Sequence, residues 1–215
     1  MSAITVPGKE DGKMKTARLA VLCCGVLALF VAAPAGAVTY DFEDLVYDTT
    51  YVVGNTFTTN GQLFELDQFQ WGNLVWTSGG HAYVDNELLA GGSGLDLELN
   101  NINLKTSFSG PVSSLGLVFG EYGGNLNIAI NGDFLNFSQL SDINGLTIGG
   151  CAIAVTNGFG NDQGTFLATG SIGTFKLGGQ ELWIDDIRTG DVVVPEPAGL
   201  GLLGLAMLVV RKKRT

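Results

Sequence analysis

Histidine and cysteine are scarce in this 215-residue sequence, and their scarcity restricts the chemistry that the side chains can perform. His81 is the single histidine, and two of the three cysteines, Cys23 and Cys24, lie in an apolar N-terminal stretch. A Ser-His-Asp triad would lack a G-x-S-x-G elbow, and a zinc site would lack ligands. Without the N-terminal stretch only Cys151 remains, so no intrachain disulfide is possible. We expect the Cys151 thiol to be buried and structural, with intermolecular pairing as the alternative.

Paired carboxylates are the remaining candidates for catalysis. Glu65 and Asp67, and likewise Asp96 and Glu98, lie two positions apart and therefore on one face of an expected strand. In an alternating strand such polar positions face solvent. We interpret these four carboxylates as surface residues and predict that the protein is not an enzyme.

Positive charge is almost absent from the central part of the chain. From Val38 to Val194 the sequence contains 18 aspartates and glutamates but only three cations, Lys105, Lys176 and Arg188, which gives a formal charge of −15. The whole chain carries −10, because the other basic residues lie at its two ends. An acidic body of this kind repels phosphate backbones, so we predict that the protein does not bind nucleic acid.

Helical periodicity is also missing between residues 38 and 191. The 32 glycines of the chain, about twice the usual share of roughly 7 %, follow no three-residue repeat, which excludes collagen. Leu95–Leu99 (LDLEL) alternates strictly, which indicates a strand with one buried face, and Asn131-Gly132 between two such runs predicts a hairpin. Further strands are expected at residues 38–45, 62–69, 81–86, 115–119, 126–130, 152–156 and 182–187. About ten strands predict an all-β fold over residues 38–191, an antiparallel β-sandwich of the jelly-roll kind.

The N-terminal segment has the order of a secretory signal peptide. A short basic segment precedes the apolar stretch Leu19–Ala33, and a small-x-small cleavage site ends at Ala37. The apolar stretch is shorter than the roughly 20 residues of a membrane span. We therefore predict that residues 1–37 are a signal peptide, with Met14 as an alternative start.

Residues 192–215 combine three parts in order. Pro195, Glu196 and Pro197 come first, and the apolar run 198–210 follows. After the apolar run come four consecutive cations near the end of the chain: Arg211, Lys212, Lys213 and Arg214. The run is short for a membrane span, but the prolines break any preceding element and the cations form a stop-transfer pattern. We expect a short transmembrane helix that orients the body outside the cytoplasm.

This tail resembles the PEP-CTERM sorting signal of Gram-negative bacteria in its Pro195-Glu196-Pro197 motif, its Gly/Leu-rich run and its basic end. The resemblance covers about the last 22 residues. It implies recognition by an exosortase, a membrane-embedded transpeptidase-like enzyme that reads Glu196 and processes the chain near the motif. It also implies an inner-membrane intermediate and delivery to the cell surface or the extracellular matrix.

The two ends of the body resemble the opening and closing strands of jelly-roll carbohydrate-binding modules. The matching residues are Phe42-Glu43 in YDFEDL and Ile184–Ile187 in ELWIDDI. In that family a structural calcium lies between these strands, which implies that Glu43, Asp185 and Asp186 supply ligands together with backbone carbonyls. Adjacent aspartates in a strand point to opposite faces, which favours Asp185. The alternative is that all three carboxylates are solvated or cap turns.

Aromatic side chains are the candidates for sugar binding, because flat rings stack on sugar faces. Trp71 and Trp76 flank an Asn-containing turn in QFQWGNLVW, and Tyr122 lies in the loop FGEYGGN. The alternative is that the tryptophans belong to the core. Taken together, the sequence predicts an exported structural or adhesive protein of the cell surface or biofilm matrix. The alternative is a calcium-stabilised carbohydrate-binding module for exopolysaccharide.

Overall fold

The structure, a computed structural model, describes residues 37–190. The predicted signal peptide up to Gly36, the Pro195-Glu196-Pro197 motif, the helix at 198–210 and the basic end all lie outside the described residues. Within residues 37–190 no helix is long and apolar enough to cross a membrane.

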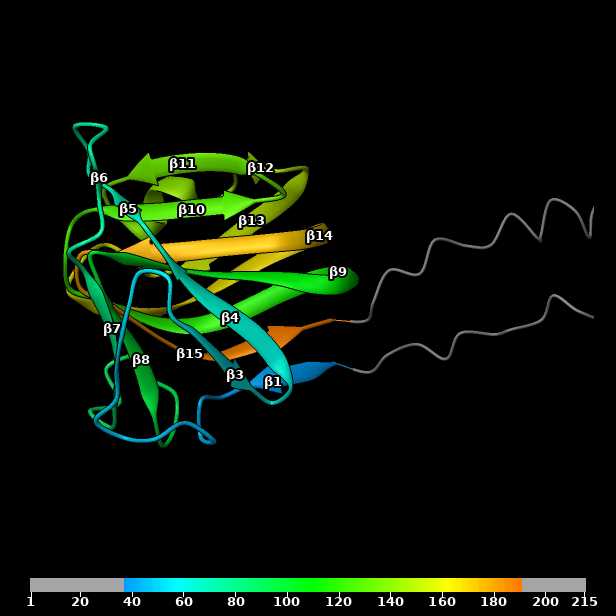
Figure 1. Cartoon of the computed structure of the whole chain (residues 1–215). Helices are drawn as coiled ribbons and strands as arrows, with labels where there is room; N and C mark the ends of the chain where they lie inside the picture. Colours follow the sequence, from blue (N-terminus) through cyan, green and yellow to red (C-terminus); the bar gives the residue numbers. More distant parts are fainter. Residues whose placement is uncertain (1–36, 191–215) are drawn as a thin grey trace, which may run out of the picture. The chain divides into compact units, whose positions relative to one another are not determined.

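The described residues form fifteen strands and one short 3₁₀ helix, and every strand pair is antiparallel (Figure 1). In chain order the elements are β1 (Val38–Tyr40), β2 (Thr50–Val52), β3 (Thr56–Thr59), β4 (Gln62–Asp67), β5 (Phe69–Gln70), β6 (Trp76–Thr77), β7 (His81–Asp85), β8 (Asp96–Asn100), β9 (Ile102–Glu121), β10 (Leu126–Ile130), β11 (Asp133–Phe137), η1 (Leu140–Ile143), β12 (Thr147–Ile148), β13 (Cys151–Thr156), β14 (Asp162–Gly179) and β15 (Leu182–Thr189). The all-β prediction is confirmed, and the jelly-roll assignment stays a prediction.

The long strands β9 and β14 pair with each other and take part in both layers of a β-sandwich. The first half of β9 and the last half of β14 belong to the sheet β3-β4-β9-β14-β10-β11, which we call the first sheet. Their other halves belong to the second sheet, β12-β13-β14-β9-β15-β8-β7-β2, with β1 also on β15. The register shifts between Thr169 and Thr174, opposite the segment of β9 that contains Pro111. Bulges and a proline bend a strand here, which lets one strand pass from layer to layer.

The core lies between the layers and is built by alternation. In β13, Cys151, Ile153 and Val155 are buried while Ala152 and Ala154 are exposed, as a half-buried strand requires. Burial of the free thiol of Cys151 confirms that expectation.

Aromatic rings fill the part of the core under β3 and β4. Phe57 and Phe64 stack at a centroid distance of 5.6 Å, and Tyr40 meets Phe64 edge-on at 5.7 Å. Each such buried ring contributes about 1.5–3 kcal/mol to folding.

The predicted hairpin at Asn131-Gly132 is confirmed. These two residues have φ of 52° and 85° and join β10 to β11 with Ile130 opposite Asp133. Two successive positive φ values define the type I′ turn, which asparagine and glycine tolerate. The turn fixes which side chains of β10 and β11 share a face.

Asp96 is the exception among the four carboxylates expected at the surface. It is 1 % exposed, whereas Glu65 and Asp67 remain partly exposed. The prediction was wrong for Asp96 because β8 is an inner strand of the second sheet, between β7 and β15, and residues 86–95 fold across its outer face. Alternation assigns a residue to a face but does not reveal what covers that face.

Candidate functional site

The segment from Gln68 to Gly80, which we call the β5–β6 segment, crosses the outer face of the first sheet. The amide groups of Asn125, Asn127 and Asn136 all donate to the carbonyl oxygen of Gln70, at 3.1, 2.9 and 2.9 Å. Asn103, Gly178, Asn127 and Asn136 are successive cross-strand neighbours, so this polar row lies on one face. Phe69 is fully buried beside it. The segment is therefore fixed at its base, and its far end carries Trp76.

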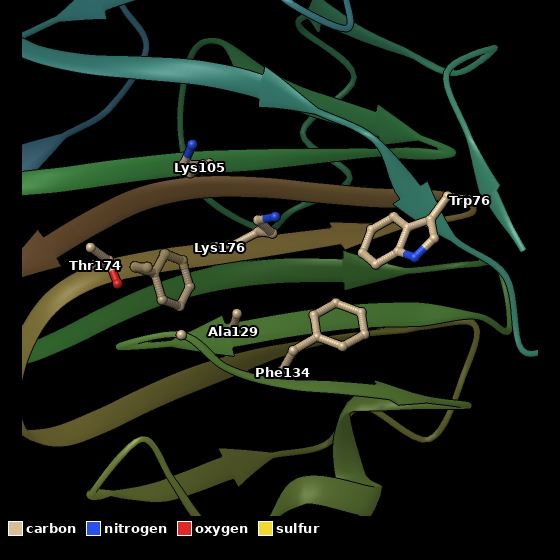
Figure 2. A pocket seen from close by; sticks show the side chains of 8 residues that line it. Trp76, Lys105, Ala129, Phe134, Thr174 and Lys176 are labelled. Atoms are coloured by element: carbon tan, nitrogen blue, oxygen red, sulfur yellow. The ribbon is translucent and has the colours of Figure 1, made fainter. Parts of the chain in front are cut away.

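A groove of about 400 Å³ lies on the same outer face, between Trp76 and strands β9, β14, β10 and β11 (Figure 2). Trp76 and Phe134 line one end, with ring centroids 5.4 Å apart. Ala129, whose side chain is small, leaves the floor open, and Thr174 adds a hydroxyl. Trp76 remains 45 % exposed, so a ligand can reach its ring.

Two lysines line the groove, and each is paired with a carboxylate. Lys105 Nζ lies 3.1 Å from Glu65 Oε2, and Lys176 Nζ lies 2.6 Å from Asp67 Oδ2. Burial acts to raise the pKa of Asp67, but hydrogen bonds from Lys176 and from a backbone N–H outweigh it and leave that pKa below its ordinary value. Lys176 Nζ also lies 6.0 Å from the centre of the Trp76 ring, at the limit of a cation–π contact.

Of the three aromatic candidates from the sequence, only Trp76 lines the groove. Trp71 is half-buried and meets Phe69 edge-on at 5.5 Å, so it anchors the β5–β6 segment. Tyr122 meets Trp183 edge-on at 5.4 Å and lies against the second sheet. Phe134 is not among the residues predicted from the sequence, although the Asn131-Gly132 turn indicates its position. The two-residue turn places Phe134 opposite Ala129, on the same face.

A second polar cluster lies on the outer face of the second sheet. Asp85 and Asp96 are cross-strand partners, and Asp185 follows on β15, since its neighbour Ile184 pairs with Leu97. We call these three aspartates the carboxylate row; they are 5 %, 1 % and 1 % exposed.

Residues 86–95, the roof loop, cover the row with backbone N–H groups. Ala90 donates to Asp96 Oδ2 at 2.9 Å and Ser93 to Asp185 Oδ2 at 3.1 Å. A Cβ atom at Gly92 would overlap with the Asp185 carboxylate, so this close approach requires glycine.

The carboxylate row is short of positive charge. Burial raises the pKa of Asp185 to about 7, and the charge of Asp186 adds to the rise. Burial likewise raises the pKa of Asp96 to about 7, with a further increase from Asp85. Asp96 Oδ1 is buried and has no hydrogen-bond partner among the described residues. Asp85 is stabilised by the indole N–H of Trp183, at 2.8 Å.

The structure brings together two of the three residues expected to bind calcium. Glu43 Oε1 accepts the N–H of Leu95 at 2.9 Å, so Glu43 and Asp185 meet the same loop. Asp186 has a φ of 52°, and its carboxylate pairs with Arg188 at 2.7 Å. Within residues 37–190 no group of three or more His, Cys, Asp or Glu side chains converges closely enough to hold a metal ion.

Comparisons with known proteins give a distant likeness in fold. No protein-family model matches the chain, and this includes any model of the PEP-CTERM signal. No curated protein matches the chain either. The catalytic unit of a thermostable GH87 α-1,3-glucanase from Streptomyces thermodiastaticus strain HF3-3 shares 13 % identity at a TM-score of 0.33, over 78 % of this chain but 29 % of the glucanase. The K2 cleaved adhesin domain of Lys-gingipain shares 12 % identity at a TM-score of 0.33, over 72 % of this chain and 99 % of the adhesin domain. The chain's likeness to these domains is distant, and neither its fold nor any ligand or activity follows from it.

Proposed function

We propose that the chain is an exported, adhesive protein of the cell surface or matrix, and that its β-sandwich binds polysaccharide in the groove beside Trp76. The observation that carries this proposal is the pairing of Trp76 with Phe134 next to two lysine–carboxylate pairs on an open sheet face. Aromatic rings offer apolar area to the apolar faces of sugar rings, and the paired side chains offer hydrogen bonds to hydroxyl groups.

The position of the groove suits a polymer. It lies on the outer face of the first sheet, and both Trp76 and Lys105 remain partly exposed along it. A chain of sugars can enter and leave such a site without its ends being bound. We propose binding rather than catalysis, because the residue inventory supplies neither a triad nor a zinc site. The jelly-roll assignment belongs to the same proposal and is supported by the antiparallel pairing of the strands in two layers.

Affinity electrophoresis of the full-length protein in gels that contain dextran, β-glucan, xylan or alginate tests the proposal. We expect retardation by at least one polysaccharide and its loss in Trp76→Ala. Leu74→Ala is the matched control, since Leu74 lies in the same segment, is 71 % exposed and does not line the groove. Retardation by none of a broad glycan panel, or equal binding by Trp76→Ala, would overturn the proposal and leave a purely structural role.

The sorting part of the proposal is supported by the sequence of the tail, which lies outside the described residues. Membrane fractionation and intact mass of the protein from its host, with and without residues 194–215, test it. A released or surface form that lacks both ends, together with mislocalisation of the deletion variant, is the expected result. An intact C-terminus held in the inner membrane would contradict processing by an exosortase.

We also propose a structural calcium ion at Glu43 and Asp185. Their approach to one loop supports it, and backbone carbonyl oxygens would have to complete the coordination, because no third carboxylate among residues 37–190 joins them. The ion would neutralise buried negative charge and tie the opening of the body to its last strand. Calcium should raise the melting temperature above that in EDTA, and Glu43→Gln should abolish the increase. An unchanged melting temperature in calcium would refute this site.

A further inference from the structure

We infer that the groove selects neutral polysaccharides, and that Glu65 and Asp67 set this selectivity by neutralising its two lysines. The inference rests on the proposed function, because it names the chemical class of ligand for the same site. Lysines in a groove would ordinarily suggest an anionic ligand such as a uronate chain.

The register places the polar pairs and the rings in one line across the sheet. Glu65 pairs with Lys105, Lys105 with Lys176, Lys176 with Ala129, and Ala129 with Phe134. Cross-strand partners share a face, so these five side chains form one row from β4 to β11. Four steps of about 4.8 Å give a row of about 19 Å. A ligand that lies along it meets the lysine–carboxylate pairs at one end and the aromatic rings at the other.

The charge along this row is balanced. The Lys105–Glu65 and Lys176–Asp67 contacts each join one cation to one anion, at 3.1 and 2.6 Å. Such a pair presents donors and acceptors side by side, as a sugar hydroxyl, which both donates and accepts, requires. A carboxylate or sulfate only accepts, so it would use the lysine and be repelled by the adjacent Glu65 or Asp67.

The surroundings also oppose an anionic chain. Among residues 37–190 the cations are Lys105, Lys176 and Arg188, and each has a carboxylate partner. The body between Val38 and Val194 has a formal charge of −15, which repels a polyanion at long range. Both local pairing and net charge therefore favour a neutral ligand.

The test is a change of selectivity in the full-length double variant Glu65→Gln/Asp67→Asn. Both substitutions keep size and hydrogen-bonding capacity, and they remove two negative charges beside the lysines. We expect the wild type to bind a neutral glucan or xylan, and not alginate or polygalacturonate, with little dependence on salt. The variant should bind the neutral polymer about tenfold more weakly and should bind alginate in a salt-sensitive manner.

The matched control is Glu87→Gln/Glu181→Gln, which changes the net charge equally at two exposed carboxylates that do not line the groove. Thermal unfolding of both double variants verifies that the fold is intact. A wild type that binds alginate through Trp76 would refute the selectivity and keep the proposed function. Unchanged selectivity in a folded Glu65→Gln/Asp67→Asn variant would also refute it. Absence of any Trp76-dependent glycan binding would refute the proposed function itself.

Discussion

Replacement of Glu121 by glutamine should remove part of the pH dependence of stability. Glu121 ends β9 and is fully buried. Its Oε2 accepts the N–H of Leu140 at 2.9 Å, and its Oε1 has no hydrogen-bond partner among the described residues. Burial raises the pKa of Glu121 to about 7 from 4.5, and the charges of Asp162 and Asp142 contribute to the rise.

The sign of the effect follows from the protons that each state binds. Below about pH 4.5 Glu121 is protonated in both the folded and the unfolded chain, so it adds no dependence on pH. Between about 4.5 and 7 the unfolded chain releases this proton while the folded protein keeps it, so the free energy of unfolding falls as the pH rises. The slope is at most about 1.4 kcal/mol per pH unit, which amounts to about 3 kcal/mol over the window.

Urea unfolding of the wild type and Glu121→Gln at pH 5, 6, 7 and 8, in the presence of EDTA, measures the difference. Glutamine keeps the acceptor for Leu140 and never ionises. The variant should therefore gain stability relative to the wild type from pH 5 to pH 8, by a midpoint shift on the order of 1 M urea. Asp96 and Asp185 contribute a slope of the same sign to both proteins, and it cancels in the comparison. Parallel pH profiles for the two proteins would refute the reasoning.

Three further predictions concern contacts within the domain. Gly92→Ala should destabilise the fold by about 2 kcal/mol in thermal or urea unfolding, because its Cβ overlaps with Asp185, whereas Gly124→Ala, which meets open space, should be tolerated. Asn127→Ala should weaken Trp76-dependent glycan binding and speed proteolysis within residues 68–80, because Asn127 holds the β5–β6 segment through hydrogen bonds to the backbone of Gln70. An unchanged rate of proteolysis would contradict this role. Cys151 should react with iodoacetamide only in denaturant, as mass spectrometry would detect, and rapid labelling of the native protein would contradict its burial.

The strands were predictable where their pattern is local. The alternation of β13 and the Asn131-Gly132 turn each depend on a few adjacent residues, and the structure confirms them. Strand β8 forms where it is predicted, but Asp96 is buried together with Leu97, so its outer face is not solvent-exposed throughout. The bend that carries β9 and β14 from one sheet to the other was not predicted. It depends on register shifts between strands more than 40 residues apart in sequence, near Val112 and Ile172, and no short window contains that pairing.

The groove was predictable only in part. The sequence indicates Trp76 by its residue type and its place beside a turn, but Trp71, on the other side of the same turn, packs on Phe69 instead. Adjacent elements of one hairpin can bury one ring and expose the other, because the face of the segment is set by its contacts with Asn127 and Asn136 on other strands. A sequence pattern gives the residues that can form a site, and long-range pairing decides which of them meet.

The carboxylate row shows that burial of charged residues, too, depends on contacts distant in sequence. Asp96 occupies a polar position in the alternating pattern of β8, yet the roof loop buries it beside Asp85 and Asp185. Burial of three adjacent carboxylates is costly unless protons or a cation neutralise them. The pKa values of Asp96 and Asp185 rise to about 7. Protons therefore neutralise these two carboxylates at acidic pH, but both carboxylates lose their protons above neutral pH. If calcium takes the place of the proton on Asp185, its stabilising effect must grow with pH, and an effect of calcium on the melting temperature that is equal at pH 5 and pH 8 would exclude it from Asp185.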